Sequence, residues 1–251
     1  MRKLDMAWIN GNIYTADDKF STAAAFGVSG DRFSVVGSTE EVLENCDEHT
    51  KIIDLQGKTV LPGLIDAHLH ITNTGAMKLN LNLVSKQKQE ILDMVADAYS
   101  SAKKGEWIIG RGWINDTWDD PSFPTKEDLD AVAPDSPVYL TRACGHAAWA
   151  NTKAFETAGI TKDTGGEFLH KQDGSLLGVV TDQAQDPFNK AIPSYTKEQI
   201  QKIVLLAQQE FFSNGLTSVQ DAGSPEEWVE AWQELYEKER LKLRIYVSMR
   251  V

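Results

Sequence analysis

The chain has 251 residues, 41% of them apolar and 25% charged, a balance that suits a globular protein with a sizeable core. Its 25 Lys and Arg residues against 37 Asp and Glu residues give a net charge of −12, which disfavours nucleic acid and anionic membranes as partners. No apolar run approaches the roughly 18–20 residues that cross a bilayer. The chain contains two cysteines, so we expect no disulfide framework and a reducing, cytoplasmic location.

The first sixty or so residues predict short strands separated by turns, and therefore a small all-β domain over residues 1–60. Asn10-Gly11 lies between two short apolar segments and is a strong signal for a two-residue hairpin turn. A further pair of strands is expected on either side of Gln56-Gly57. No helix longer than residues 40–45 is expected in this part of the chain.

After Pro62 the pattern changes to alternating strands and helices, which is typical of a parallel sheet or a (β/α) barrel. Residues 63–68 predict a strand. Apolar residues at helical spacing predict a helix between residues 86 and 104. Two short apolar runs, at residues 107–110 and 138–141, are bounded by Gly or Pro and are candidates for further strands.

The last third of the chain carries the clearest signals. Thr196 and Gln199 form a capping box. The helix that they open carries five apolar residues on one face: Ile200, Ile203, Val204, Ala207 and Phe211. A strand over residues 216–221 follows, and a second helix is expected to open at Ser224, with proline in its first position. Residues 241–251 alternate between apolar and polar, which suits a half-exposed strand better than a barrel stave.

A complete (β/α)₈ barrel needs about 250 residues by itself. Because residues 1–60 are assigned to the β domain, we expect residues 61–251 to hold only the first part of a barrel and the chain to resemble the N-terminal half of something larger. An incomplete barrel leaves a strand edge uncovered, so association into a homo-oligomer is a further expectation.

Two of the five histidines stand in the segment Asp66-Ala67-His68-Leu69-His70. Side chains two residues apart in a strand point to the same face, so His68 and His70 can converge on one metal ion, with Asp66 on the same face to orient a ligand. The alternative is a pair of histidines that end a strand and are satisfied by hydrogen bonds. Their place at the carboxyl end of an apolar strand favours the metal, because barrel enzymes put their chemistry there.

Residues 61–70, LPGLIDAHLH, resemble the P-G-[FL]-I-D-x-H-x-H signature of the amidohydrolase superfamily. Further segments are similar, in the same order, to its N-substituted formamide deformylase-like branch: residues 110–113, 128–134, 142–151, 165–180 and 215–219. The resemblance implies a (β/α)₈ TIM-type barrel beside a small β-sandwich portion. It also implies metal-dependent hydrolysis of a C–N amide bond in a small-molecule substrate through a metal-activated water, with Zn²⁺ as the expected divalent metal.

Within this resemblance, His68 and His70 match the metal ligands of the first barrel strand, and Asp182 matches a bridging carboxylate that is usually Glu. The two further histidine ligands of the family have no counterpart after Asp182, and the aspartate that acts as general base is expected beyond Val251. The alternative function is therefore a non-catalytic fragment, or the metal-binding half of a larger hydrolase.

Three more residues are candidates for substrate binding, each with a structural alternative. His146 matches a family histidine near the substrate, or is a buried histidine bonded to backbone. Arg142 holds a substrate carbonyl or carboxylate, or pairs with the acidic stretch at residues 116–135. Trp113 is a wall of the substrate pocket or part of the core. Cys144 is expected to be a buried core residue.

Overall fold

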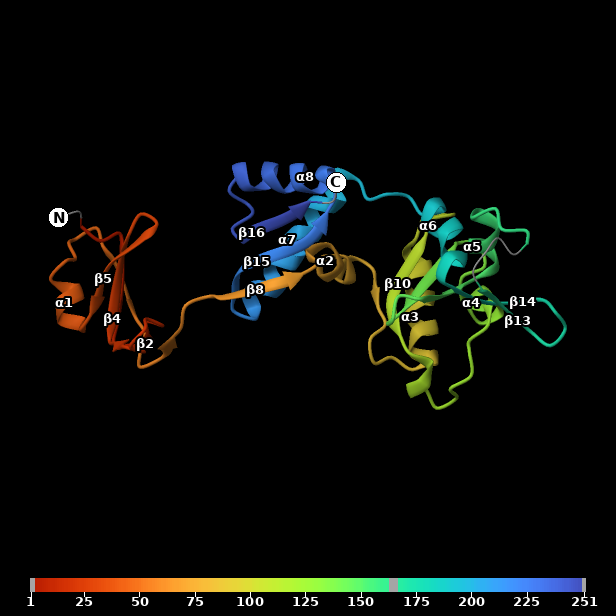
Figure 1. Ribbon diagram of the computed structural model, residues 1–251, viewed down its shortest axis with the longest axis horizontal. Coiled ribbons are helices and arrows are strands. Elements are labelled where there is room, and N and C mark those ends of the chain that lie inside the picture. The colour runs from red at the N-terminus through yellow and green to blue at the C-terminus, as the bar shows by residue number, and fades with distance from the viewer. Residues whose placement is uncertain (1–2, 163–166, 250–251) are drawn as a thin grey trace. The chain divides into compact units, whose positions relative to one another are not determined.

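The computed structural model describes residues 3–162 and 167–249, and the chain divides into two compact units (Figure 1). The units comprise Met1–Ile65 with Gly215–Ser218, and Asp66–Asn214 with Val219–Val251. Some residues used in the predictions above lie outside the described part of the chain, namely the Gly-Gly pair at residues 165–166 and Val251. None of the helices in the described part of the chain is long and apolar enough to span a membrane.

The N-terminal strands form two small sheets, one of order β5-β4-β1-β6 and one of order β3-β2-β7. Their elements are β1 (Met6–Ile9), β2 (Asn12–Tyr14), β3 (Thr22–Ala23), β4 (Ala25–Ser29), β5 (Arg32–Gly37), α1 (Thr39–Leu43), β6 (Lys51–Asp54) and β7 (Thr59–Val60). Leu4, Ala7, Ala25 and Val42 form the buried core of this part.

The hairpin expected at Asn10-Gly11 is not formed. Strand β1 pairs with β4 on one side and β6 on the other, whereas β2 pairs with β3 and β7. Asn10 does have the left-handed backbone of such a turn, with φ of 56°. Because both edges of β1 are already paired, the turn carries the chain into the second sheet instead of folding β2 back onto β1.

A three-stranded sheet of order β16-β15-β8 carries the histidine pair. Its strands are β8 (Leu64–Leu69), β15 (Leu216–Ser224) and β16 (Arg244–Met249). Their arrows point the same way in Figure 1, as right-handed strand–helix–strand connections produce. Helix α7 (Lys197–Ser213) packs against both α2 (Ile71–Leu79) and α8 (Glu226–Glu237). The carboxyl ends of β8 and β15 therefore meet at one edge of the sheet.

Helix α7 forms as its sequence predicts. The Thr196 hydroxyl accepts a hydrogen bond from the backbone N–H of Gln199, and the Gln199 side chain accepts one from the backbone N–H of Thr196. All five apolar residues of the predicted face are buried. Gly215 follows the helix with φ of 78°, a conformation that glycine adopts without steric cost.

The predicted start of α8 is wrong by one residue. Ser224 is the last residue of β15, and Pro225 occupies the N-cap position without a side-chain cap. The Ser224 hydroxyl instead donates to the Asp221 carboxylate, at 2.6 Å. A carboxylate forms a stronger hydrogen bond with a hydroxyl than an uncharged backbone N–H group does. The Ser224 hydroxyl therefore binds Asp221 instead of capping α8.

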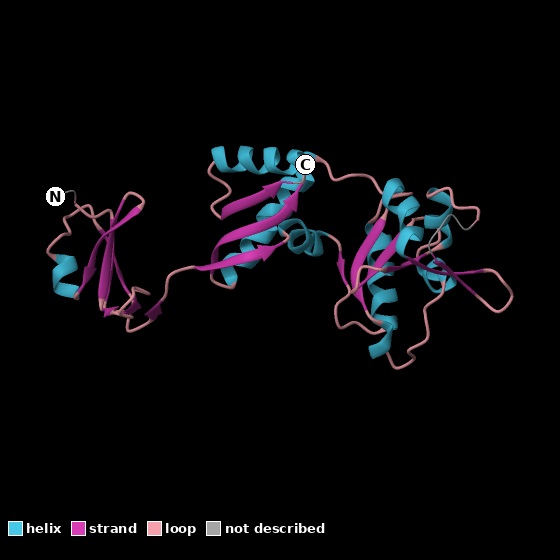
Figure 2. Cartoon of the chain, in the orientation of Figure 1, coloured by secondary structure: helices cyan, strands magenta, loops and turns pink. Residues whose placement is uncertain are grey.

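Between α2 and α7 the chain builds a lobe, residues 81–191, with a six-stranded sheet of order β13-β14-β12-β11-β10-β9 (Figure 2). Its strands are β9 (Leu81–Asn82), β10 (Ile108–Trp113), β11 (Val138–Arg142), β12 (Ala147–Ala150), β13 (Glu167–His170) and β14 (Leu176–Thr181). Its helices are α3 (Lys88–Ser101), α4 (Lys126–Val132), α5 (Thr152–Thr157) and α6 (Asp186–Ala191), with short 3₁₀ turns η1 (Asn115–Thr117) and η2 (Asp182–Gln185).

The lobe corrects the expectation that strands and helices alternate through one sheet. The runs at residues 107–110 and 138–141 do form strands, β10 and β11, and these pair in parallel. Strand β10 has β9 on its other side, and β11 has the antiparallel β12. With both edges occupied, neither strand has hydrogen-bonding groups left for β8, so the lobe is a sheet of its own.

Three tryptophans lie at the centre of the lobe. The rings of Trp113, Trp118 and Trp149 lie 5.8–6.4 Å apart between centroids. Each indole N–H donates to a backbone carbonyl, at 2.7 Å to Leu140 for Trp113. These bonds satisfy the buried indole donors and tie the cluster to β11, one of the strands that carry the β11–β12 turn.

Candidate functional site

The histidine pair lies at the carboxyl end of β8. His68 is within the strand, His70 occupies the N-cap position of α2, and both side chains are exposed. The ring centroids are 5.8 Å apart. Two imidazoles that bind one zinc ion through nitrogens at about 2.0–2.1 Å have centroids roughly 5–6 Å apart. The separation therefore fits two ligands of one metal ion.

Two carboxylates hold the backbone around this pair. Asp66 accepts a hydrogen bond from the backbone N–H of His68, at 2.9 Å, so it acts on the strand itself and not on an imidazole. Asp221, on β15, accepts from the backbone N–H of Ile71 at 2.9 Å. The sequence analysis gives no role to Asp221, since the two residues are 150 positions apart and no local pattern connects them.

The other candidates gather at the turn between β11 and β12. Ala147 pairs with Thr181 across β12 and β14, and the backbone N–H of Asp182 donates to the carbonyl of His146, at 2.9 Å. Both the His146 and the Asp182 side chains are exposed. Among the described residues, no three His, Cys, Asp or Glu side chains form a group that could hold a metal ion. Asp182 therefore lies beside His146 and does not join the histidine pair in such a group.

Arg142 is engaged with protein partners. Its guanidinium forms an ion pair with Asp116, in the acidic stretch, and donates to the Asn115 side chain at 3.3 Å. It also lies 5.8 Å from the centre of the Trp113 ring. The ion pair that the sequence analysis weighs for Arg142 is present. These contacts hold the end of β11 and leave the Arg142 side chain only partly exposed.

Trp113 has no exposed surface. A side chain without exposed surface cannot line an open pocket, so the structure places Trp113 in the core and not at a pocket wall. Its indole faces the Arg142 guanidinium from inside the lobe. Trp113 therefore supports the β11–β12 turn from the core of the lobe.

Cys144 is exposed, and the expectation that it packs in the core is wrong. Strand β11 ends at Arg142, which leaves Cys144 in a turn where Gly145 has φ of 79°. Burial would raise the pKa of the thiol, but hydrogen bonds from the backbone and side chain of His146 and from Arg142 outweigh it and lower the pKa to about 7.

The thiolate is the reactive form of cysteine, so alkylation of Cys144 is expected to follow this low pKa. In a Cys46→Ser variant, which leaves Cys144 as the single cysteine, the iodoacetamide rate should rise with a midpoint near pH 7. Replacing the cation in Arg142→Gln should move the midpoint upward, toward the ordinary thiol value of about 8.5. Identical midpoints in the two proteins would show that Arg142 does not stabilise the thiolate.

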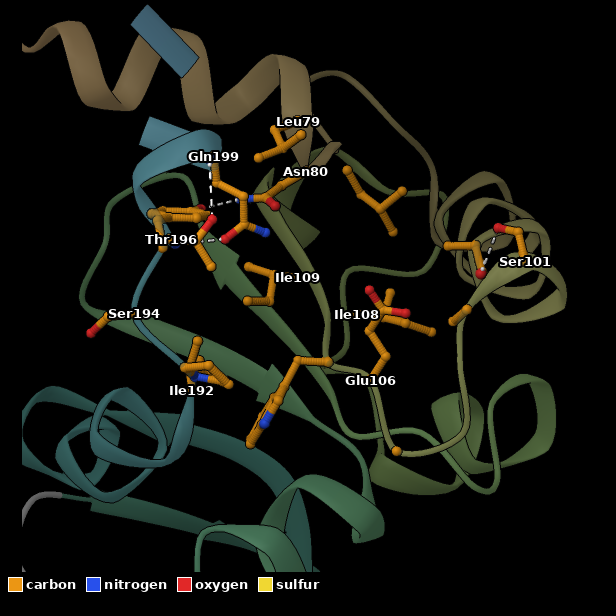
Figure 3. A pocket seen from close by; sticks show the side chains of 17 residues that line it. Leu79, Asn80, Ser101, Glu106, Ile108, Ile109, Ile192, Ser194, Thr196 and Gln199 are labelled. Carbon is orange, nitrogen blue, oxygen red and sulfur yellow. Dashed lines mark hydrogen bonds between the residues drawn. The ribbon is translucent and has the colours of Figure 1, made fainter. Parts of the chain in front are cut away.

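A cavity of about 620 Å³ lies elsewhere in the second unit (Figure 3). It is lined by the ends of α2 and α3, the start of β10 and residues 192–199. The Asn80 amide donates to the Tyr195 hydroxyl in its wall, at 2.8 Å. None of the site residues predicted from the sequence lines this cavity, so it is not the candidate metal site.

Comparison with known proteins places these observations in a family. The chain is 32% identical over 224 residues to the Protein LONG AFTER FAR-RED 3 of Arabidopsis thaliana, covering 87% of this chain and 38% of that protein. It is 30% identical over 229 residues to the N-substituted formamide deformylase of Arthrobacter pascens, covering 87% of this chain and 42% of the enzyme. The chain thus spans about two fifths of the length of these curated relatives.

A solved structure shows the same fold. The crystal structure of an uncharacterized metal-dependent hydrolase from Pyrococcus furiosus superposes with a TM-score of 0.76 at 28% identity, covering 97% of this chain and 50% of that one. The sequence model of the amidohydrolase family matches residues 51–249, which include the histidine pair, the lobe and the β16-β15-β8 sheet. The chain belongs to the amidohydrolase family.

Proposed function

We propose that the protein acts in metal-dependent hydrolysis of a C–N amide bond in a small molecule. His68 and His70 are the ligands of a divalent ion, for which Zn²⁺ is the first candidate. The observation that carries the proposal is the pair of exposed imidazoles, 5.8 Å apart between ring centroids, at the carboxyl end of β8. The family and the metal-dependent hydrolase with the same fold support it. The deformylase relative supports an amide-type bond as the target. The three strands β8, β15 and β16 would then be the first staves of a (β/α)₈ barrel, beside a β-sandwich portion from residues 1–60.

Each residue has a defined task in this proposal. A bound Zn²⁺ would lower the pKa of its water toward about 7 and polarise the substrate carbonyl. His68 and His70 supply neutral nitrogen ligands, and the hydrogen bond from the backbone of His68 to Asp66 holds the strand that presents them. Asp182 is proposed as a further carboxylate ligand on the sequence resemblance alone, because in this structure it lies beside His146 and, among the described residues, forms no metal-binding group with the histidine pair.

The β11–β12 turn would supply the substrate contacts. His146 is exposed on this turn, where its side chain also donates to the Cys144 thiol, and its imidazole would contact a substrate carbonyl. Arg142 keeps part of its side chain exposed beside the Asp116 ion pair and would add a cationic contact. Trp113 supports both by holding Arg142 from the core.

The proposal is tested by the metal content of the purified protein after dialysis. The wild-type protein should retain zinc or a similar divalent ion, and the double variant His68→Ala, His70→Ala should lose it. His49→Ala is the matched control, because His49 is also exposed but lies in the loop between α1 and β6. If Asp182 is a ligand, Asp182→Asn should retain less metal than Asp182→Glu. Equal metal in wild type and the double variant would contradict the proposal.

A further inference from the structure

Asp221 is a buried carboxylate with two hydrogen-bond donors. Its side chain lies on β15 and the residue is 1% exposed. The Ile71 backbone N–H donates to one of its oxygens at 2.9 Å, and the Ser224 hydroxyl donates to the other at 2.6 Å. Burial of a carboxylate is costly unless such donors and a positive charge compensate. The N-terminus of α2 supplies that positive potential.

The helix α2 begins without help from its own N-cap residue. His70 occupies this position with φ of −121° and ψ of 100°, and its side chain makes no capping hydrogen bond. A helix usually satisfies its first N–H groups with a side chain at the N-cap. Ile71 is fully buried, so its N–H cannot turn to water. Asp221 takes over the capping from the neighbouring strand and leaves the His70 imidazole exposed.

We propose that Asp221 is a positioning residue for the metal pair: its carboxylate, held by Ser224, caps α2 and so fixes the backbone of His70 while leaving the imidazole free for the ion. This inference rests on the proposed function, because it assumes that His68 and His70 bind the metal. It adds a residue of β15 to a site whose two histidines both come from the β8–α2 segment. The residue contributes no atom to the metal.

Three changes separate positioning from general stability. Asp221→Ala removes the acceptor and leaves the Ile71 N–H buried without a partner. Asp221→Asn keeps an oxygen for that N–H. Asn151→Ala is the matched control in the lobe: Asn151 is also fully buried, and its side chain also accepts from the first turn of a helix, at 2.9 Å from the Ala154 N–H.

The affinity of each protein for Co²⁺ is measured by titration followed through the visible absorption of the bound ion, and a thermal melt is recorded alongside. Asp221→Ala should bind Co²⁺ roughly 10–100-fold more weakly than wild type, the range for lost residues that orient metal ligands. Asp221→Asn should recover most of the affinity. Asn151→Ala should lower the melting temperature and leave Co²⁺ binding unchanged.

The outcomes distinguish the two proposals. If the wild-type protein binds no Co²⁺ or Zn²⁺, or if the His68→Ala, His70→Ala variant binds as wild type does, the proposed function fails and the inference fails with it. If the histidines are required but Asp221→Ala binds normally, the positioning role alone is overturned. An equal loss of affinity in Asp221→Ala and Asn151→Ala would also overturn it, because the effect would then follow stability and not local geometry.

Discussion

Replacing Trp113 with alanine is expected to destabilise the lobe by ~3–5 kcal/mol, the usual loss for a large aromatic side chain removed from a core. Trp113 has no exposed surface and contacts two other tryptophans. The substitution would leave a cavity and would also remove the donor to the Leu140 carbonyl. The Trp113→Phe variant keeps most of the ring and should lose less.

The measurement is a denaturation curve followed by near-ultraviolet circular dichroism, which reports on the packed tryptophan cluster. Phe123→Ala is the control, since Phe123 is 44% exposed and its loss should change the free energy of unfolding by no more than about 0.5 kcal/mol. If Trp113→Ala unfolds like wild type but binds substrate poorly, Trp113 would be a pocket wall and its placement in the core would be wrong.

Replacing Gly75 with alanine is expected to displace α2 from α7. A Cβ atom on Gly75 would lie 2.1 Å from the backbone carbonyl oxygen of Ile203, a contact that no side-chain rotation can relieve. Alanine favours a helix by up to ~1 kcal/mol over glycine, but the overpacking typically costs about 1–3 kcal/mol or more. We therefore expect a net loss of stability together with weaker metal binding, because α2 directly follows His70.

Thermal melts and Co²⁺ titrations of the same samples check this expectation. Asn73→Ala is the control, because Asn73 is exposed on the same helix and its replacement adds helix propensity without a new contact. A Gly75→Ala protein that is as stable as wild type would show that the two helices can separate at no cost. Normal metal affinity in a destabilised Gly75→Ala protein would show that the position of α2 against α7 does not affect metal binding by His70.

Local signals in the sequence predict local structure well in this chain. The capping box at Thr196 fixes the start of α7, and the spacing from Ile200 to Phe211 predicts its buried face, because both depend on residues within a few positions of each other. The strand that carries His68 and leads into His70 is predicted for the same reason, because an apolar run followed by alternating residues is a local signal.

Which strands pair with one another could not be predicted from these local signals. The turn at Asn10-Gly11 has the predicted backbone, yet β1 and β2 belong to different sheets, because the edges of β1 are taken by strands from elsewhere in the chain. The same holds for β10 and β11, which pair within the lobe and not with β8. A periodic pattern identifies a strand but carries no information about which edge it will find.

In the candidate site, too, local sequence signals identify some residues, whereas others depend on contacts between distant parts of the chain. His68 and His70 are recognisable because they are two residues apart where β8 ends and α2 begins, whereas Asp221 acts on Ile71 across the sheet and leaves no trace in the local sequence. Cys144 is misjudged because its exposure depends on where β11 ends. The lowered pKa of its thiol depends on hydrogen bonds from His146 and Arg142, whose placement only the folded turn provides.

X-ray absorption at the zinc edge of the zinc-loaded protein tests most directly whether His68 and His70 bind the metal. We predict a spectrum with the multiple-scattering pattern of two imidazole rings and nitrogen at about 2.0–2.1 Å from the ion. This pattern should be absent from the His68→Ala, His70→Ala variant under the same loading. A wild-type spectrum without imidazole scattering, or the same spectrum in both proteins, would contradict the assignment of this pair as the metal ligands.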